Sequence, residues 1–194
     1  VEMVFPEESL GAAMFPQGLS KALTEKYQQK GIEIHAGELP ERIHRRDGVL
    51  VVELRGGGSL AGDVIVAGVG IEPRVRLAEL ADLEVDNGIK VNEHLQTSNP
   101  DIYAAGDIAA CHYPALNRAM RFEHWDCAMS QGAAAGKNMA GESSAYTELP
   151  YFFSDLYDFG YEAVGDTNAS YDVVEDWQEE NVKGVLYYLN EGTV

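Results

Sequence analysis

The sequence predicts an α/β protein whose last part is α+β, with an antiparallel sheet. Three observations predict this fold class. The first third alternates strand, helix and strand patterns, and an apolar run near the middle ends in Gly-Asp ahead of a helix rich in small residues. From Thr147 onwards, aromatic residues alternate with polar ones in short strand-like runs.

The first third predicts a strand at residues 1–5 and a helix at residues 17–30. The helix is indicated by Leu19, Leu23 and Tyr27, which recur every four positions on one face. The further elements expected here are a helix cap at Gly31, a strand at 32–35, a hairpin between a strand starting at Ile43 and a strand at 49–54, a turn at 56–58 and a short buried strand at 63–67. This order is typical of the latter part of a nucleotide-binding α/β domain.

The segment Thr97–Asp107 is the most informative stretch. Its extended run, residues 102–105, ends in Gly106, where the missing side chain lets the backbone approach a ligand closely. Asp107 then places a carboxylate at a strand end, where open α/β sheets bind ligands. A carboxylate repels a diphosphate, so Asp107 is expected to accept hydrogen bonds from sugar-like hydroxyls. The alternative is a buried strand that ends in an ordinary Gly-Asp turn.

Two further loops carry glycine. Gly68 and Gly70 interrupt the segment 67–74 and permit close approach to a ligand, although on these residues alone a plain loop is favoured. A hairpin is expected at 83–91 around Asn87-Gly88.

A helix is predicted from Glu123 to Met139. Its small residues allow close packing against a sheet or a flat ring, and Glu123 favours the helix N-terminus through the macrodipole. His124 has no metal-ligand spacing around it, so no metal site is expected. Beyond a boundary near Ala145, residues 149–156 predict a buried aromatic strand or turn. Antiparallel strands are expected at 161–165, 171–174 and 182–189.

Composition excludes several classes of protein. The net charge of −18 argues against nucleic acid or an anionic membrane surface as a partner, and no apolar run is long enough to span a bilayer. The acids that concentrate after Glu142 favour a solvated acidic face over a docking patch for a basic partner.

Cys111 and Cys127 form no C-x-x-C pair, and two thiols without a secretory signal predict a cytoplasmic protein. The start inside a strand, without Met, predicts a fragment.

Several motifs, in the same order, resemble one family. Thr97–Asp107 resembles the second flavin-binding motif of FAD- and NAD(P)-dependent reductases of the pyridine nucleotide–disulfide oxidoreductase type. Residues 121–126 resemble the Glu-His segment of the apoptosis-inducing-factor and ferredoxin (rubredoxin) reductase branch. Residues 149–156 resemble its Pro-x-Phe-Trp-Ser-Asp motif, with Phe153 at the usual tryptophan position.

The resemblance implies two cofactors, FAD and NAD(P)H, and a role for each motif. Asp107 would contact the ribityl and diphosphate region of FAD, Glu123 and His124 would lie near the isoalloxazine and nicotinamide, and Phe152 or Phe153 would shield the flavin. The cofactor-binding residues expected in this way are Gly68, Gly70, Gly106, Asp107, Glu123, His124, Trp125, Phe152 and Phe153.

The resemblance also implies three domains, of which the first two are remnants of nucleotide-binding three-layer domains. Residues 1–74 end an NAD(P)-binding domain, residues 75–146 form the second segment of an FAD-binding domain, and residues 147–194 form an incomplete C-terminal domain with an antiparallel sheet. No Gly-x-Gly-x-x-Gly occurs in the chain, so both dinucleotide fingerprints are expected upstream. The implied function is electron transfer from NAD(P)H through FAD to a ferredoxin- or rubredoxin-like protein or a quinone, and a homodimer is expected. The alternatives are a redox-sensing or partner-binding flavoprotein like apoptosis-inducing factor, and a purely structural unit.

Overall fold

The computed structural model describes the whole chain, residues 1–194. Contacts divide it into two compact units, and each is described by itself. One unit contains residues 1–69 and 167–194, and the other contains residues 70–166. The three domains expected from the sequence stay a prediction.

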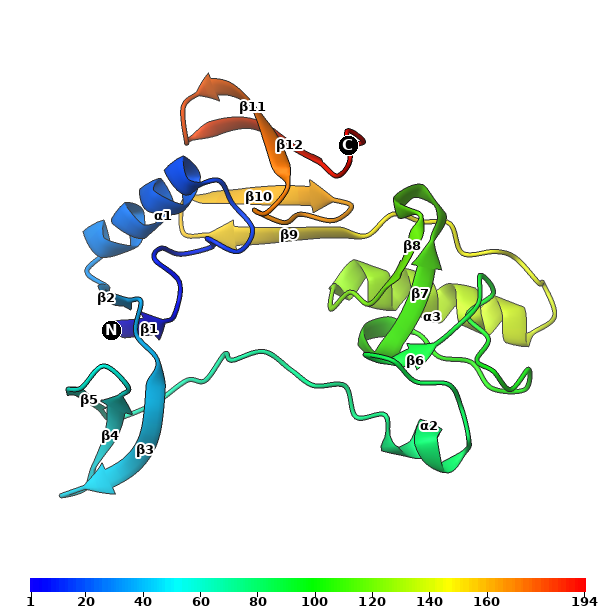
Figure 1. Cartoon of the computed structure of the whole chain (residues 1–194), viewed down its shortest axis with the longest axis horizontal. Coiled ribbons are helices and arrows are strands. Elements are labelled where there is room, and N and C mark those ends of the chain that lie inside the picture. Colours follow the sequence, from blue (N-terminus) through cyan, green and yellow to red (C-terminus); the bar gives the residue numbers. More distant parts are fainter. The chain divides into compact units, whose positions relative to one another are not determined.

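In the first unit, a strand–helix–strand segment opens the chain. Helix α1 (Gln17–Gln29) connects strands β1 (Glu2–Phe5) and β2 (Glu33–Ala36), which pair in parallel (Figure 1). The helix ends as the sequence predicts. Gly31 has a φ of +85°, and its N–H donates to the carbonyl of Gln28. This positive φ lets the chain leave the helix with its last carbonyls satisfied.

A three-stranded antiparallel sheet follows. Strands β3 (Pro40–Arg46) and β4 (Val49–Leu54) form the predicted hairpin, and β5 (Ser59–Gly62) pairs with the other edge of β4. Asp47 and Gly48 both have positive φ, as the two-residue turn between these strands requires.

The buried strand predicted at residues 63–67 is wrong. The segment has no regular structure, and Val64 and Val66 are 77% and 91% exposed. An apolar run becomes a buried strand only where neighbouring strands satisfy its backbone. Strand β4 pairs with residues 59–62 instead, and β1 and β2 pair only with each other.

The first unit also contains the end of the chain. Strands β11 (Asp172–Glu179) and β12 (Lys183–Leu189) form an antiparallel hairpin, which confirms the strands expected there. The hydroxyl of Tyr188 donates to the carbonyl of Met14 at 2.8 Å and so joins this hairpin to the loop before α1.

The second unit is built around helix α3 (Trp125–Met139) and a small mixed sheet. Its strands are β6 (Ile89–Lys90), β7 (Ala109–Tyr113) and β8 (Arg118–Met120), with β6 parallel and β8 antiparallel to β7 (Figure 1). A buried core of Leu95, Cys111, Tyr113, Ala135 and Tyr146 joins β7 to α3.

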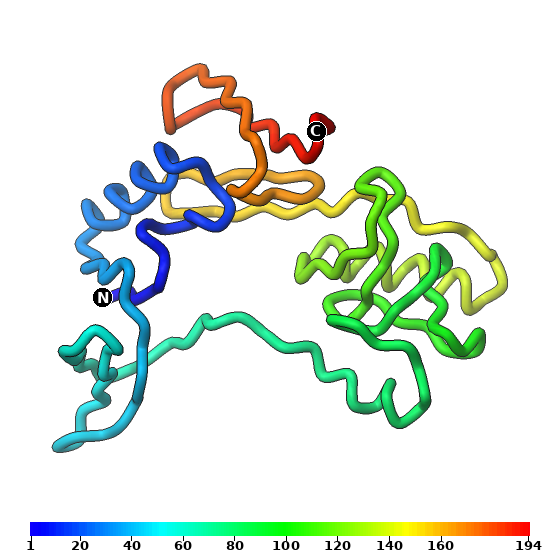
Figure 2. The backbone as a smooth tube through the Cα atoms, in the orientation of Figure 1, coloured from blue at the N-terminus to red at the C-terminus, as the bar shows by residue number.

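Two shorter features complete this unit. Helix α2 (Arg76–Leu80) precedes the sheet, and strands β9 (Tyr151–Leu156) and β10 (Phe159–Val164) form an antiparallel hairpin in which the chain reverses direction (Figure 2). The sequence predicts β9 and β10 but gives no indication of α2, β7 or β8.

The hairpin expected at 83–91 forms only in part. Asn87 and Gly88 adopt the positive φ of a turn, but a single bridge, Val85 to Ile89, connects its arms. Residues 89–90 pair with β7 instead, because a parallel neighbour is available there. The run 102–105 is extended but joins no continuous ladder, and its cross-strand bridge is Gln96 to Tyr103.

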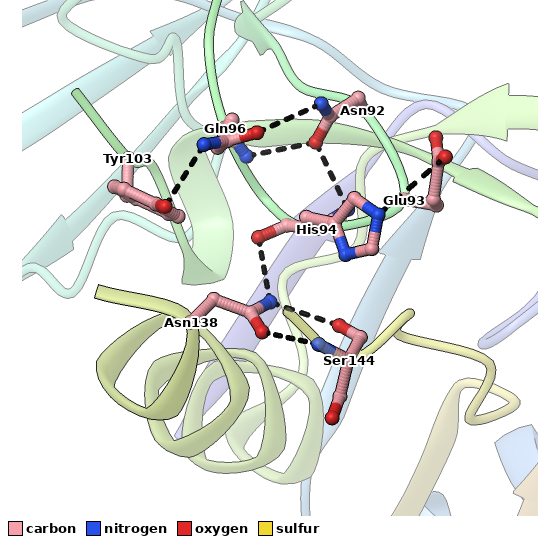
Figure 3. Close-up of polar contacts among 7 residues, drawn as sticks. All are labelled: Asn92, Glu93, His94, Gln96, Tyr103, Asn138 and Ser144. Atoms are coloured by element: carbon pink, nitrogen blue, oxygen red, sulfur yellow. Dashed lines mark hydrogen bonds and ion pairs between the residues drawn. The ribbon is translucent and has the colours of Figure 1, made fainter. Parts of the chain in front are cut away.

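Side-chain amides fix helix α3 to the loop that contains His94 and Gln96 (Figure 3). The Asn138 Nδ2 atom donates to the carbonyls of His94 and Ser144, and the Asn138 Oδ1 atom accepts the N–H of Ser144 at 2.7 Å. Gln96 in turn donates to the hydroxyl of Tyr103 at 2.9 Å. These bonds orient the helix relative to the Gly106–Asp107 turn.

No helix of the chain is both long enough and apolar enough to cross a membrane.

Candidate functional site

The Gly106–Asp107 turn lies where the extended run meets helix α3. Gly106 is buried and has a φ of +77°, and a Cβ added to it would lie 3.3 Å from the Cβ of Ala128. The turn therefore needs glycine both for its backbone conformation and for its close approach to α3.

The backbone on each side of this turn is fixed by a side chain. The Gly106 N–H donates to Oε1 of Gln131 at 2.8 Å, and the Asp107 carbonyl accepts a hydrogen bond from Nη1 of Arg121 at 2.8 Å. The Asp107 carboxylate itself is exposed and makes no hydrogen bond or ion pair within the chain. The arrangement leaves an oriented anionic acceptor open to a ligand.

Arg121 connects three segments around the turn. Besides Asp107, its guanidinium donates to the Asn87 carbonyl at 3.0 Å and pairs with the Glu123 carboxylate at 2.9 Å. A Cβ on Gly88 would lie 2.9 Å from the Arg121 side chain and 2.7 Å from the carbonyl of Ile108. Gly88 therefore leaves the space through which Arg121 reaches the site.

His124 is the N-cap residue of α3. Its carbonyl accepts the N–H of Ala128, and its ring packs between Phe122 and Phe152, with centroids 5.2 Å and 4.3 Å away. Burial lowers the pKa of the imidazole, while the charges of Asp107 and Glu123 act in the opposite direction. The net shift is downward, so His124 is neutral at pH 7.

The expected aromatic residues differ in their surroundings. Phe152 packs on His124 and lies edge-on to Tyr161, with ring centroids 5.9 Å apart. Trp125 and Phe153 are 72% and 54% exposed. Phe152 therefore supports the imidazole, whereas Trp125 and Phe153 present apolar surface outward.

Two of the expected residues are not brought to this turn. Gly68 belongs to the other compact unit, and Gly70 lies in the irregular segment 64–75. An added Cβ would meet open space at both positions, although Gly70 has a φ of +85°. Their expected role in cofactor binding stays a prediction.

Sequence reasoning missed Gln131 and Arg121. Gln131 is the only long polar side chain between Ser130 and Lys137 in a helix otherwise filled with small residues, which is the signal that could have found it. Arg121 is a cation two residues before the expected site residue Glu123, and this spacing could have indicated an ion pair between them.

The two cysteines have the surroundings of structural thiols. Both are free and buried, and burial raises the pKa of Cys111 to about 11 and also raises that of Cys127. A protonated, buried thiol is a poor nucleophile.

A cluster of possible metal ligands lies on β1 and β2. One side-chain ligand atom from each of Glu2, Glu33 and His35 lies within 4.8 Å of the other two, but both carboxylates are exposed, and exposed acidic groups of this kind are common without a metal.

Comparison with known proteins decides the family. The model of the pyridine nucleotide-disulphide oxidoreductase family matches residues 1–132. The chain belongs to this family. Its members are FAD- and NAD(P)H-dependent reductases, and the chain has the α/β fold of such proteins.

The relatives include an apoptosis-inducing factor and a ferredoxin reductase component. The chain is 33% identical to apoptosis-inducing factor 1, mitochondrial, of Dictyostelium discoideum over 98% of its length, which is 39% of that protein. It is also 33% identical to the ferredoxin–NAD(+) reductase component of the anthranilate 1,2-dioxygenase system of Burkholderia cepacia, over 85% of this chain and 41% of that protein.

A solved structure of the family gives the same result. The covalent putidaredoxin reductase–putidaredoxin complex matches 98% of this chain and 46% of its own chain, with a TM-score of 0.84 and 28% identity. The chain spans about two-fifths of the length of these curated relatives.

The residues of the turn fit the FAD that the family implies. Gly106 provides close backbone approach, and the exposed Asp107 carboxylate has no partner of its own. A carboxylate accepts hydrogen bonds from hydroxyl groups such as those of a ribityl chain. The N-terminus of α3 adds unpaired N–H groups and a partial positive charge next to the Gly106–Asp107 turn.

Proposed function

We propose that the intact protein is an FAD-dependent NAD(P)H oxidoreductase that passes electrons to a ferredoxin- or rubredoxin-like protein or a quinone. The observation that carries this proposal is the unpartnered Asp107 carboxylate on a backbone held by Gln131 and Arg121. The similarity to a ferredoxin–NAD(+) reductase component and to putidaredoxin reductase supports the choice of acceptor.

Bound FAD would supply the redox chemistry, namely hydride acceptance from NAD(P)H and single-electron release. The residues of this chain bind and orient. Asp107 holds flavin hydroxyls, and the N-terminal N–H groups of α3 stabilise negative charge beside them. Glu123 and His124 order the nicotinamide, and a neutral His124 does so without adding a positive charge.

The closest competing function is that of a redox-sensing or partner-binding flavoprotein. One observation favours it: the similarity to apoptosis-inducing factor 1 covers 98% of the chain, more than the similarity to the ferredoxin–NAD(+) reductase component does. Such a protein would still bind FAD at the same turn but would reduce external acceptors slowly.

A panel of acceptors tests the proposal. The full-length protein is loaded with FAD and mixed with NADH or NADPH and, in turn, a ferredoxin, a rubredoxin and a quinone analogue. We expect rapid turnover with at least one of them, at a kcat of the order of 1–1,000 s⁻¹ that is typical of enzymes. Stable flavin binding with slow turnover toward all three would favour the redox-sensing alternative.

A cytoplasmic location is part of the same proposal and is supported by the two free cysteines, since thiols stay reduced in that compartment.

A further inference from the structure

Gln131 is a fully buried amide in the middle of helix α3. Its side chain is 1% exposed, so both of its polar ends need partners. Oε1 accepts the Gly106 N–H at 2.8 Å, and Nε2 donates to the Tyr113 hydroxyl at 2.9 Å. One side chain of α3 therefore binds both the Gly106 turn and the end of β7, which lie 25 and 18 residues before it in the sequence.

The Gly106 N–H depends on this contact. Gly106 is buried, and its N–H donates to no backbone carbonyl, whereas the neighbouring Ala104 N–H donates to Leu95. Glycine also has the widest choice of backbone conformations. Without Gln131, a buried N–H would lack a partner at the residue most free to turn away.

Tyr113 is the second hydrogen-bond partner of Gln131. Its ring is 1% exposed and lies edge-on to Phe122 and Tyr146, with centroids 5.2 Å and 6.2 Å away. The Tyr146 hydroxyl contacts Ser130 on α3 at 2.9 Å. The Nε2 end of the Gln131 amide is thus satisfied in the core, and the Oε1 end is left to bind the Gly106 N–H.

We infer that Gln131 is a positioning residue that fixes the Gly106 peptide, so that the Asp107 carboxylate is oriented for its ligand before the ligand binds. This inference rests on the proposed function, in which that ligand is FAD. Preorganisation raises affinity because the turn need not be ordered at the moment of binding.

Three substitutions in the full-length protein test this role. Gln131→Met keeps the length of the side chain but removes both hydrogen bonds. Gln131→Glu keeps an oxygen for Gly106 and a partner for Tyr113 in either protonation state. Tyr113→Phe is the matched control, because it removes the other hydrogen bond of the same amide and leaves Gly106 bound.

The readouts are amide hydrogen exchange of residues 102–108 without FAD, and the Kd for FAD. We expect Gln131→Met to speed exchange of this segment and to raise the Kd about tenfold, the effect of one hydrogen bond. Gln131→Glu should restore both values. Tyr113→Phe, which removes one of the two hydrogen bonds of Gln131, should lower thermal stability by no more than Gln131→Met while leaving exchange and Kd near those of the wild type.

Two results would overturn the inference. The first is the same change in Kd and exchange for Tyr113→Phe and Gln131→Met. The second is rapid exchange of the Gly106 amide in the wild-type protein. Exchange is measured without FAD. A protein that bound no FAD would therefore refute the proposed function, while the exchange pattern would still decide whether Gln131 fixes the turn.

Discussion

The Asp107 side chain is exposed and unpartnered, while the backbone on both sides of it is fixed by hydrogen bonds. Asp107→Ala should therefore change the free energy of unfolding of the full-length protein by less than about 0.5 kcal/mol, the usual effect of a surface substitution. FAD affinity should fall about 10- to 100-fold, because hydrogen bonds to a charged group contribute about 1.5–3 kcal/mol.

Asp101→Ala is the matched control, since it removes an exposed carboxylate from the same segment. Isothermal titration with FAD and thermal unfolding measure both effects. Equal FAD affinities for the wild type and Asp107→Ala would exclude Asp107 from the flavin site.

His124 makes stability depend on pH. Burial lowers its pKa in the folded protein below the ordinary value of 6.5, so the unfolded chain binds a proton more readily. The stabilising effect is complete above pH 6.5 and is lost as the pH falls toward the folded pKa. His124→Phe, which keeps a ring between Phe122 and Phe152, should lose less stability than the wild type between pH 7.5 and pH 5.

Thermal unfolding at these two pH values measures the difference, and comparison with the variant cancels the other titrating groups. A loss of stability that is the same in both proteins would mean that His124 is not held neutral by burial.

At the scale of elements, local patterns predicted what local interactions determine. The repeat of apolar residues in α1, the Gly31 cap and the Asp47-Gly48 turn all formed as expected. The strand at 63–67 failed because its pattern shows only that the run is apolar, whereas pairing depends on distant segments. Strand β7 was missed for a different reason, because Ala109, Ala110 and Cys111 are small residues in a row that show no alternation of apolar and polar side chains.

The candidate site divides in the same way. Asp107, Glu123, His124 and Phe152 were expected from motifs, and the structure brings them to one end of α3. Gln131 stands out in the sequence as a long polar side chain, but its contacts could not be predicted, because its two partners lie 25 and 18 residues away and are brought to it by the packing of α3 on β7.

The turn before β6 tests the role of Gly88 as an element of the site. Gly88→Ala combines a φ of +129° with contacts of 2.7 Å and 2.9 Å, whereas the control Gly48→Ala has a positive φ but open space. Positive φ alone costs about 1–2 kcal/mol. Gly88→Ala should exceed the cost of Gly48→Ala by about 1 kcal/mol or more, the range of overpacking, in denaturant unfolding.

Gly88→Ala should also weaken FAD binding, because it displaces Arg121 from the Asp107 carbonyl. Equal losses of stability for the two variants, with unchanged FAD affinity in both, would show that Arg121 does not depend on Gly88.

At the scale of the whole molecule, the chain joins two compact units and spans about two-fifths of its curated relatives. One of the units contains the Asp107 turn, its two backbone supports and the N-terminus of α3. The family is one of FAD- and NAD(P)H-dependent reductases. The central claim is that this turn forms part of a flavin site at which a nicotinamide nucleotide reacts.

Anaerobic rapid mixing of the full-length, FAD-loaded protein with NADH, and separately with NADPH, tests this claim most directly. We predict that the visible absorption of the bound flavin is bleached by at least one of the two nucleotides, and that Asp107→Ala retains too little flavin to show the change at the same protein concentration. A full-length protein that cannot be loaded with FAD, or whose bound flavin neither nucleotide reduces, would contradict the claim.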